Sequence, residues 1–233
     1  MHIPDGFINA TTSLGAGAVT LGGISVAVRR SAATLEDRQV PLAGLVAAFV
    51  FAAQMLNFPV AAGTSGHLIG GVLAAVLVGP WAGALCLAVV LLVQALFADG
   101  GLTALGLNVL NLAFAAGLGG YALFLGLRRL LPKTGSAIVL CAGVASGLSV
   151  VLAALAFLVE YALGANVGVP IGTVAVSVVG VHVLIGVGEG VITAMTVSAV
   201  LSIRPDLVHG ARDIAVTTLR SSNRPAPVVE GLR

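Results

Sequence analysis

Charged residues are scarce in this chain. Lys, Arg, Asp and Glu together make up 9% of the 233 residues, whereas about a quarter of the residues in a typical soluble domain are charged. Hydrophobic residues make up 58% of the chain, and its mean hydropathy is +1.11. This balance excludes an ordinary soluble domain and indicates a membrane protein that crosses the bilayer several times.

Several sequence motifs with well-defined chemistry are missing as well. Neither a Walker A sequence, a dinucleotide-binding fingerprint nor a zinc-type cysteine cluster occurs. We therefore expect no organic cofactor, and ATP-driven transport by this chain would need another subunit to supply the energy. The two cysteines, Cys86 and Cys141, lie within apolar runs, which is typical of small packing residues and not of a disulfide.

The N-terminus lacks the positive charge that opens a secretory signal. His2 follows Met1 directly, and the first basic residue is Arg29. Because His2 is bulky, we expect the initiator methionine to be kept, so that a free amine lies beside the amide and imidazole nitrogens of His2. Those nitrogens can chelate one ion, and they favour Ni(II) or Cu(II), and also Co(II). The alternative is that His2 is an accidental second residue of a frayed terminus.

A fourth donor for such a chelate must come from elsewhere in the chain. Neutral imidazole is the commonest candidate, and His67 is our choice. This choice requires the two histidines to lie on the same side of the membrane.

Seven apolar segments are long enough to predict an all-α bundle of seven transmembrane helices. They cover residues 10–28, 41–58, 67–79, 82–98, 105–127, 136–162 and 171–202. The third segment is short, and Pro80 prevents it from continuing as a regular helix. The alternative count is six, with 67–98 as a hairpin that does not fully cross.

The basic residues predict the orientation of the bundle. They fall only after the first, fifth and seventh segments, and they are Arg29, Arg30, Arg38, Arg128, Arg129, Lys133, Arg204, Arg212, Arg220, Arg224 and Arg233. Seven crossings put these places on one side, which the positive-inside rule assigns to the cytoplasm. The N-terminus and the start of the 67–79 segment then face outward, as a shared metal site requires.

Polar residues gather near the same outer side. They are Gln54, Asn57, Thr64, Ser65, His67, Gln94, Asp99, Asn108 and Asn111.

 In lipid such groups are costly unless they face the bundle interior or a cavity, so Asp99 and its polar neighbours indicate an outward-facing pocket. The alternative is that each amide only forms hydrogen bonds between helices.

The segment 171–202 carries His182 and, seven positions later, Glu189. Ionisable residues within a membrane helix mark functional sites by default. We expect His182 to support the site or the packing, and Glu189 to be a candidate for coupling to a cytoplasmic partner. Small residues four apart, such as Gly143 and Gly147, predict closely packed helices.

Several sequence blocks occur together in this chain. They are Met1–Phe7, Phe51–Val60, Gly63–Leu68, Leu77–Gly83, Phe97–Gly106, Asn108 to Asn111, and His182–Gly190. These blocks resemble the cobalt/nickel substrate-binding membrane proteins of the CbiM/NikM type, and the likeness runs from residue 1 to about residue 202. Members of that family are S components of energy-coupling-factor (ECF) importers.

The resemblance implies how the site is assembled. The N-terminal loop, residues 1–9, would fold back into a membrane-embedded substrate-binding domain, residues 1–202. Met1 and His2 would hold the ion together with His67. Supporting groups would be Asn57, Ser65, Asp99 and His182. Residues 203–233 would form a polar cytoplasmic tail.

The resemblance also implies the function and the partners. The chain would be no enzyme but the capture subunit for Ni2+ or Co2+ in a multi-pass importer of the prokaryotic cell membrane. Its partners would be a transmembrane coupling subunit of the CbiQ/NikQ type, ATPases of the CbiO/NikO type and, where used, a small accessory membrane subunit of the CbiN/NikN type. Neither cobalt nor nickel is favoured over the other by these ligands.

One competing hypothesis comes from a different class of protein. Ser65 stands in Gly63-Thr64-Ser65-Gly66, and His182 lies on a later helix. Together they have the outline of the serine–histidine dyad of a rhomboid-like intramembrane protease. This hypothesis leaves the Met1-His2 start unexplained.

Overall fold

The computed structural model describes residues 1–60 and 64–213. Most of the predicted cytoplasmic tail, from residue 214 onward, lies outside the described residues. So do Arg220, Arg224 and Arg233.

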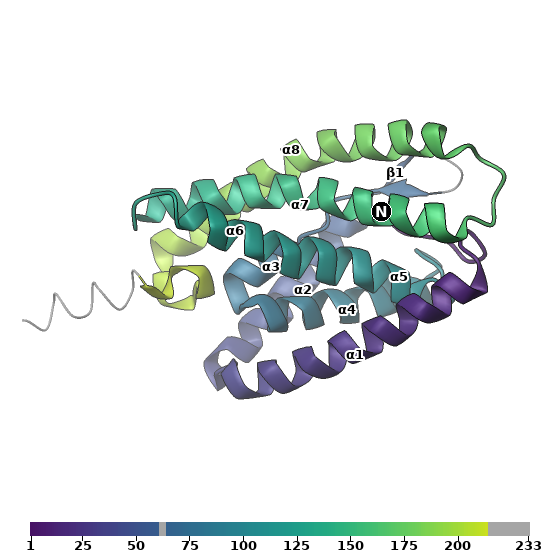
Figure 1. Cartoon of the computed structure of the whole chain (residues 1–233). Coiled ribbons are helices and arrows are strands. Elements are labelled where there is room, and N and C mark those ends of the chain that lie inside the picture. Colours follow the sequence, from purple (N-terminus) through teal and green to yellow (C-terminus); the bar gives the residue numbers. More distant parts are fainter. Residues whose placement is uncertain (61–63, 214–233) are drawn as a thin grey trace, which may run out of the picture.

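The described chain is an all-α bundle (Figure 1). Its helices are α1 (Ala10–Thr34), α2 (Val40–Gln54), α3 (Gly71–Val78), α4 (Pro80–Leu96), α5 (Leu105–Val109), the π-helix η2 (Leu110–Gly119), α6 (Gly120–Arg128), α7 (Gly135–Gly164) and α8 (Ile171–Ile203). A short 3-10 helix, η1 (Asp37–Gln39), lies between α1 and α2, and two more, η3 (Pro205–Leu207) and η4 (His209–Ala211), follow α8. Because α5, η2 and α6 run on without a break, the described residues form seven helical rods. The number of rods equals the number of predicted segments.

Four of these rods are long and apolar enough to cross a membrane. They are α1, the continuous rod of residues 105–128, α7 and α8. The helices α2 and α4 are apolar but shorter. The fold is therefore that of an all-α membrane protein, as predicted.

The third helix differs from its prediction. Only Gly71–Val78 is helical, and every one of these 8 residues is buried. At 1.5 Å per residue the helix is about 12 Å long, which is less than half of a bilayer core. The left-handed φ of +75° at Gly70 prevents the helix from starting earlier. The expectation that His67 opens this helix is therefore wrong.

A small β-ribbon precedes this helix. Its strands β1 (Phe58–Pro59) and β2 (Ser65–Gly66) are antiparallel, with Phe58 opposite Gly66 and Pro59 opposite Ser65. Two-residue strands that contain proline leave no alternating pattern, so the sequence did not predict them. The ribbon leads the chain directly into His67.

The loops gather at the two ends of the bundle (Figure 1). At one end the N-terminal loop pairs with the α7–α8 connection, where Ile8 and Ala165 form a β-bridge and the Asn9 N–H donates to the Gly164 carbonyl at 2.7 Å. At the other end Arg212 lies 3.3 Å from the Gln39 amide oxygen. The described basic segments thus lie at the end opposite the N-terminal loop.

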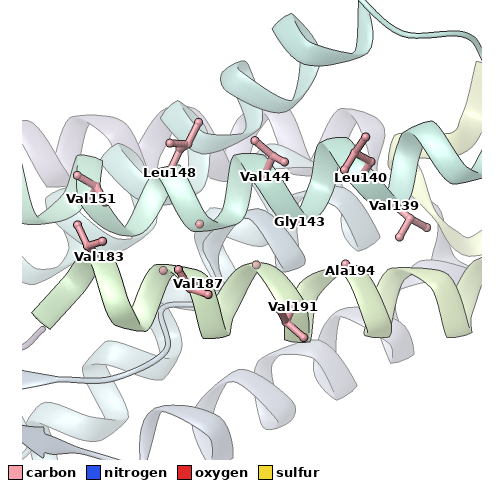
Figure 2. A pocket seen from close by; sticks show the side chains of 13 residues that line it. Val139, Leu140, Gly143, Val144, Leu148, Val151, Val183, Val187, Val191 and Ala194 are labelled. Carbon is pink, nitrogen blue, oxygen red and sulfur yellow. The ribbon is translucent and has the colours of Figure 1, made fainter.

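The pair α7 and α8 packs closely through glycine. A Cβ on Gly186 would lie 2.6 Å from the Gly147 carbonyl oxygen, and one on Gly190 would lie 2.8 Å from that of Gly143. Figure 2 shows the apolar cavity of about 460 Å³ that runs along these glycines. The predicted packing of small residues is confirmed for this pair.

Candidate metal centre

The N-terminal loop folds back into the bundle and is buried at its tip. Met1 is 1% exposed and His2 is 4% exposed. The main chain of Ile3 forms hydrogen bonds with both polar atoms of the Asn108 side chain, at 2.8 and 3.2 Å, and accepts a further one from the Gly101 N–H at 2.9 Å. These contacts fix the first residues of the chain against the rod of residues 105–128.

The outer part of the loop is held by polar contacts at its rim. The Asp5 carboxylate accepts hydrogen bonds from the Thr103 N–H at 2.8 Å and from its hydroxyl at 2.5 Å. The Asn166 side chain donates to the Gly6 carbonyl at 3.1 Å. Asn9 caps α1 by accepting from the Thr12 N–H at 2.9 Å. The loop is therefore anchored on both sides.

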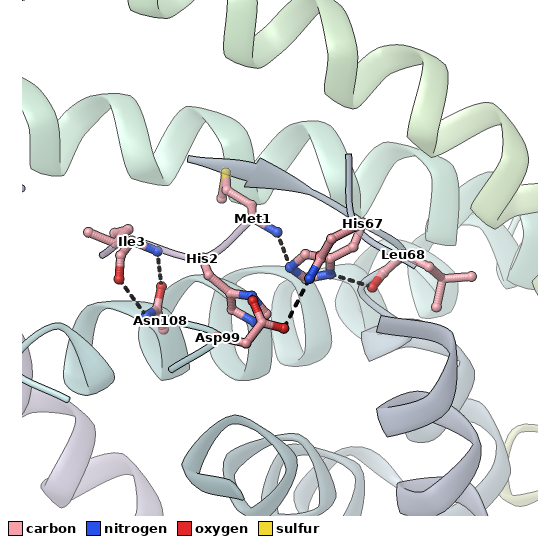
Figure 3. Close-up of polar contacts among 8 residues, drawn as sticks. Met1, His2, Ile3, His67, Leu68, Asp99 and Asn108 are labelled. Carbon is pink, nitrogen blue, oxygen red and sulfur yellow. Dashed lines mark hydrogen bonds and ion pairs between the residues drawn. The ribbon is translucent and has the colours of Figure 1, made fainter. Parts of the chain in front are cut away.

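His67 presents a free ring nitrogen to this loop. Its Nδ1 donates to the Leu68 carbonyl at 2.8 Å, so the proton of the neutral ring belongs on Nδ1 and the lone pair on Nε2. That Nε2 contacts the Met1 amine (Figure 3). The His67 side chain is fully buried. Two nitrogen donors from residues 66 positions apart thus meet in the interior.

Buried hydrogen bonds hold the segment around His67 in place. The Glu189 carboxylate accepts from the N–H groups of Ile69 and Gly70 at 2.6 and 2.9 Å. The Gln54 side chain donates to the Ile69 carbonyl at 2.7 Å. Because Ile69 and Gly70 come just before α3, the carboxylate also satisfies N–H groups at the start of that helix. The helices α2 and α8 together set the position of His67.

The His2 ring lies against the His67 ring. Their centroids are 4.2 Å apart, with an angle of 29° between the planes. The Nδ1 of His2 is 3.0 Å from one oxygen of Asp99, and the other oxygen accepts from the Asn57 amide at 3.0 Å. Of the predicted supporting residues, Asp99 therefore contacts His2, and Asn57 contacts Asp99.

Three buried polar atoms near His2 lack hydrogen-bond partners among the described residues. They are Nε2 of His2 and both side-chain polar atoms of Gln94. The Gln94 side chain nevertheless lies close enough to influence the pKa of His2. Within the same part of the chain, the His2 amide nitrogen takes part in no hydrogen bond. A buried polar atom without a hydrogen-bond partner destabilises the fold. Each of these atoms can therefore still form a hydrogen bond or bind a metal ion.

The electrostatics favour neutral nitrogen donors. Burial lowers the pKa of the Met1 amine well below its usual range, although the Asp99 and Glu189 carboxylates oppose this. Burial also lowers the pKa of His2, while the hydrogen bond to Asp99 raises it in part. For Asp99, burial raises the pKa, but the contacts with His2 and Asn57 outweigh it and keep the pKa below its usual value. Lone pairs on the amine and the imidazoles are thereby kept available for a metal ion.

This donor set suits a nitrogen-preferring transition metal. Among the described residues, no three His, Cys, Asp or Glu side chains form a cluster that could hold a metal ion. The donors gathered here are instead a main-chain amine, a main-chain amide and two imidazoles. Imidazole and amine nitrogens suit nickel, copper and cobalt, whereas Mg2+ and Ca2+ prefer oxygen ligands.

The remaining predicted residues lie nearby without touching the nitrogen pair. His182 is fully buried, its Nδ1 donates to the Val178 carbonyl at 2.7 Å, and its Nε2 has no partner among the described residues. The Ser65 hydroxyl is also buried without a partner in that set. Ser65 and His182 therefore form no dyad, which removes the geometric basis of the protease hypothesis.

Sequence reasoning gave no role to some residues that build the site. The sequence marks Gln54, Gln94 and Asn108 only as polar residues of the outer side, yet the structure places them around the N-terminal loop and His67. Their spacing along the chain carries no signal for these contacts. The only signal in the sequence is that a side-chain amide within a membrane bundle needs a hydrogen-bond partner, and this signal does not say which partner.

The fold defines the class of protein. The chain is similar to the crystal structure of a truncated transition metal transporter, with a TM-score of 0.80 and 31% sequence identity over 87% of this chain and 99% of that one. It is thus a multi-pass membrane protein with a transition metal transporter fold, and not an enzyme.

The sequence comparisons identify the family. Residues 2–207 match the family described as "CbiM: Cobalt uptake substrate-specific transmembrane region", and the chain belongs to that family. A protein of Haloquadratum walsbyi with a provisional name as a metal transport protein is 41% identical over 89% of this chain and 93% of its own length. The fused nickel transport protein NikMN of Rhodobacter capsulatus is 40% identical over 69% of this chain and 47% of its own length. The protease hypothesis is therefore wrong.

Proposed function

We propose that this chain is the substrate-capture subunit of an ATP-driven ECF importer for Ni2+ or Co2+. The ion would lie in a square-planar field of four nitrogens: the Met1 amine, the His2 amide, the His2 imidazole and Nε2 of His67. The observation that carries this proposal is the buried contact between the Met1 amine and Nε2 of His67. Without a metal the amine can donate an N–H to Nε2 of His67, whereas a cation placed between them would be bound by the lone pairs of both nitrogens.

The ion would complete the bonding of the site. Binding would use the unpaired His2 amide after loss of its proton. Chelation through Nδ1 of His2 also requires this nitrogen to give up its contact with Asp99. We propose that, before a metal ion binds, Asp99 holds the His2 ring near its metal-binding position. The Asn57 amide in turn orients the Asp99 carboxylate. Ser65 and His182 would then support the surrounding packing.

The membrane orientation follows from the charges. We propose that the N-terminal end of the bundle faces outward and that the basic end faces the cytoplasm. The ion would be captured from outside and released inward when the bundle is reoriented by its partners. Glu189, which bonds the segment after His67 from α8, is in a position to transmit a movement of α8 to the site.

The partners would be those of its family. We propose a coupling subunit of the CbiQ/NikQ type, ATPases of the CbiO/NikO type and an accessory subunit of the CbiN/NikN type. Support for the accessory subunit comes from the Rhodobacter capsulatus relative, whose name describes a fused NikMN protein and of which this chain spans about half.

Uptake of radioactive nickel or cobalt by cells that express the chain with these partners tests the proposal. The His67→Ala variant should lose uptake by more than about tenfold, because even groups that only orient a metal ligand contribute tenfold or more. The Ser65→Ala variant should keep most of it. Uptake at the native rate by His67→Ala, at equal expression, would contradict the proposed site.

A further inference from the structure

A second cavity lies at the basic end of the bundle, far along the chain from the metal centre. Its volume is about 520 Å³. The floor is formed by apolar side chains of α6, namely Tyr121, Phe124 and Leu125. The cationic side chains around it are Arg128, Arg129, Lys133 and Arg212. The cavity therefore combines an apolar surface with a positive rim.

The positive charge of the rim is only partly neutralised by this chain. Arg128 donates to Asp213 at 3.2 Å and to the Pro132 carbonyl at 3.2 Å. Arg212 donates to the neutral Gln39 at 3.3 Å and lies 3.9 Å from the Glu36 carboxylate. Arg129 and Lys133, by contrast, are exposed, and their side chains have no hydrogen bond or ion pair with another described residue.

The neighbouring histidine adds no charge to this rim at neutral pH. His209 lines the same cavity. Burial lowers its pKa to about 4, and the nearby Arg212 acts in the same direction. The ring is therefore neutral and can only contribute a hydrogen bond. An anion entering the cavity would meet Arg129 and Lys133 as its unpaired cations.

The position of the cavity specifies the kind of anion. It lies where the rod of residues 105–128 ends, so its apolar floor continues into the membrane-facing surface of α6, where Leu125 is 44% exposed. Basic pockets between membrane helices on the cytoplasmic side bind anionic lipid headgroups. A free phosphate would use only the rim, whereas a phospholipid would use both the rim and the floor.

We propose that this cavity binds an anionic phospholipid. Its phosphodiester would lie between Arg129 and Lys133, and one acyl chain would follow Leu125 along α6. Such a lipid would fix the start of the α6–α7 connection to the η4 segment, since both line the cavity. This site is independent of the metal centre and rests on the proposed function only for the orientation of the bundle in the membrane.

Lipid retention by the purified full chain tests the proposal. Native mass spectrometry would compare phosphatidylglycerol with phosphatidylcholine added to the detergent-solubilised protein. We expect selective retention of phosphatidylglycerol, reduced by about tenfold in the Arg129→Gln/Lys133→Gln double variant. The matched control is Arg29→Gln/Arg30→Gln, which removes the same charge from exposed positions on α1 and should retain the lipid as the native chain does.

Three results would overturn the proposal. One is equal retention of the two lipids, and another is an equal loss in both double variants, which would indicate diffuse charge attraction. The third is displacement of phosphatidylglycerol by millimolar inorganic phosphate, which would indicate a simple anion site. If the double variant does not fold, Leu125→Gln tests the apolar floor instead, and unchanged retention by that variant would also contradict the proposal.

Discussion

A ring nitrogen can bind a metal only when the proton of the ring is held elsewhere. In His67 the ring proton is on Nδ1, which donates it in a hydrogen bond to the Leu68 carbonyl. The lone pair of Nε2 is therefore available to a metal ion. His2 has the opposite requirement, because chelation through Nδ1 places the proton on Nε2. The amide oxygen of Gln94 is an unpaired acceptor beside that ring. Metal-binding histidines usually donate their second N–H to such a group.

The first prediction concerns Gln94. Replacing it with Leu removes the acceptor for His2 and should weaken Ni2+ binding by about tenfold or more, as loss of an orienting partner does in other metal sites. Gln94→Glu keeps an acceptor oxygen and should restore most of the affinity. Isothermal titration calorimetry on the purified variants measures both. Equal affinity of the Leu variant and the native chain would exclude this role.

The second prediction concerns Glu189. Its carboxylate accepts hydrogen bonds from Ile69, Gly70 and Ser146. The Glu189→Gln variant turns one oxygen into a donor, which leaves a buried N–H unpaired. Such a loss costs about 1–3 kcal/mol, so the melting temperature should fall, and Ni2+ binding should weaken because His67 is less well positioned.

Asp37→Asn is the matched control for Glu189→Gln, since Asp37 is exposed at η1. Thermal unfolding in detergent and a Ni2+ titration should leave this control unchanged. A Glu189→Gln protein as stable as the control would show that the three hydrogen bonds do not hold the segment.

At the scale of elements, the site depends on a close approach between two loops. The N-terminal loop lies so near residues 99–104 that a Cβ on Gly101 would come 2.4 Å from the Asp5 amide nitrogen and 2.8 Å from the Pro4 carbonyl carbon. Contacts this short with main-chain atoms cannot be relieved by a side-chain movement. Glycine at position 101 is therefore needed for the loop to enter the bundle.

The third prediction follows from this approach. The Gly101→Ala variant should displace residues 1–8, speed their hydrogen exchange and weaken metal binding. Gly126→Ala is the control, because nothing lies within 4 Å of a Cβ at that position. Hydrogen–deuterium exchange with mass spectrometry compares the two variants. Unchanged exchange of the N-terminal peptide in Gly101→Ala would contradict the packing described for this loop.

The long helices were predictable from sequence, and the elements at the site were only partly so. Apolar runs gave α7 and α8 almost to the residue, because their length and hydropathy are strong signals. The start of α3 was misplaced because the conformation of Gly70 depends on tertiary contacts, among them the packing of Val50 against it. The β-ribbon and the contacts of Gln54, Gln94 and Asn108 join distant parts of the chain and leave no local pattern.

At the scale of the whole molecule, the end opposite the metal centre is closed by η4. His209 packs between Gly79 and Tyr121, with its ring centroid 6.2 Å from that of Tyr121. It also lines a cavity with Trp81, the single tryptophan of the chain. Burial lowers the pKa of His209 to about 4. The intrinsic fluorescence of Trp81 can therefore report on this end of the bundle.

The fourth prediction is a pH dependence of this closure. The pKa of His209 is lower in the folded chain than its ordinary value of about 6.5, so the unfolded form binds the proton more readily. The contribution of the packed neutral ring is fully present above about pH 6.5 and is lost as the pH falls toward 4. Trp81 fluorescence should change over that range in the native chain and not in His209→Phe. A midpoint near 6.5 would contradict the burial of the ring.

The most direct test of the account is metal binding by chains that differ only at the N-terminus. The purified native protein would be compared with a version that carries one added residue before Met1, which moves the free amine away from His67. Metal content by inductively coupled plasma mass spectrometry and the visible absorption spectrum would be recorded for both. We predict bound nickel with a square-planar spectrum in the native protein alone. Equal metal in both proteins, or none in either, would contradict the proposed N-terminal chelate.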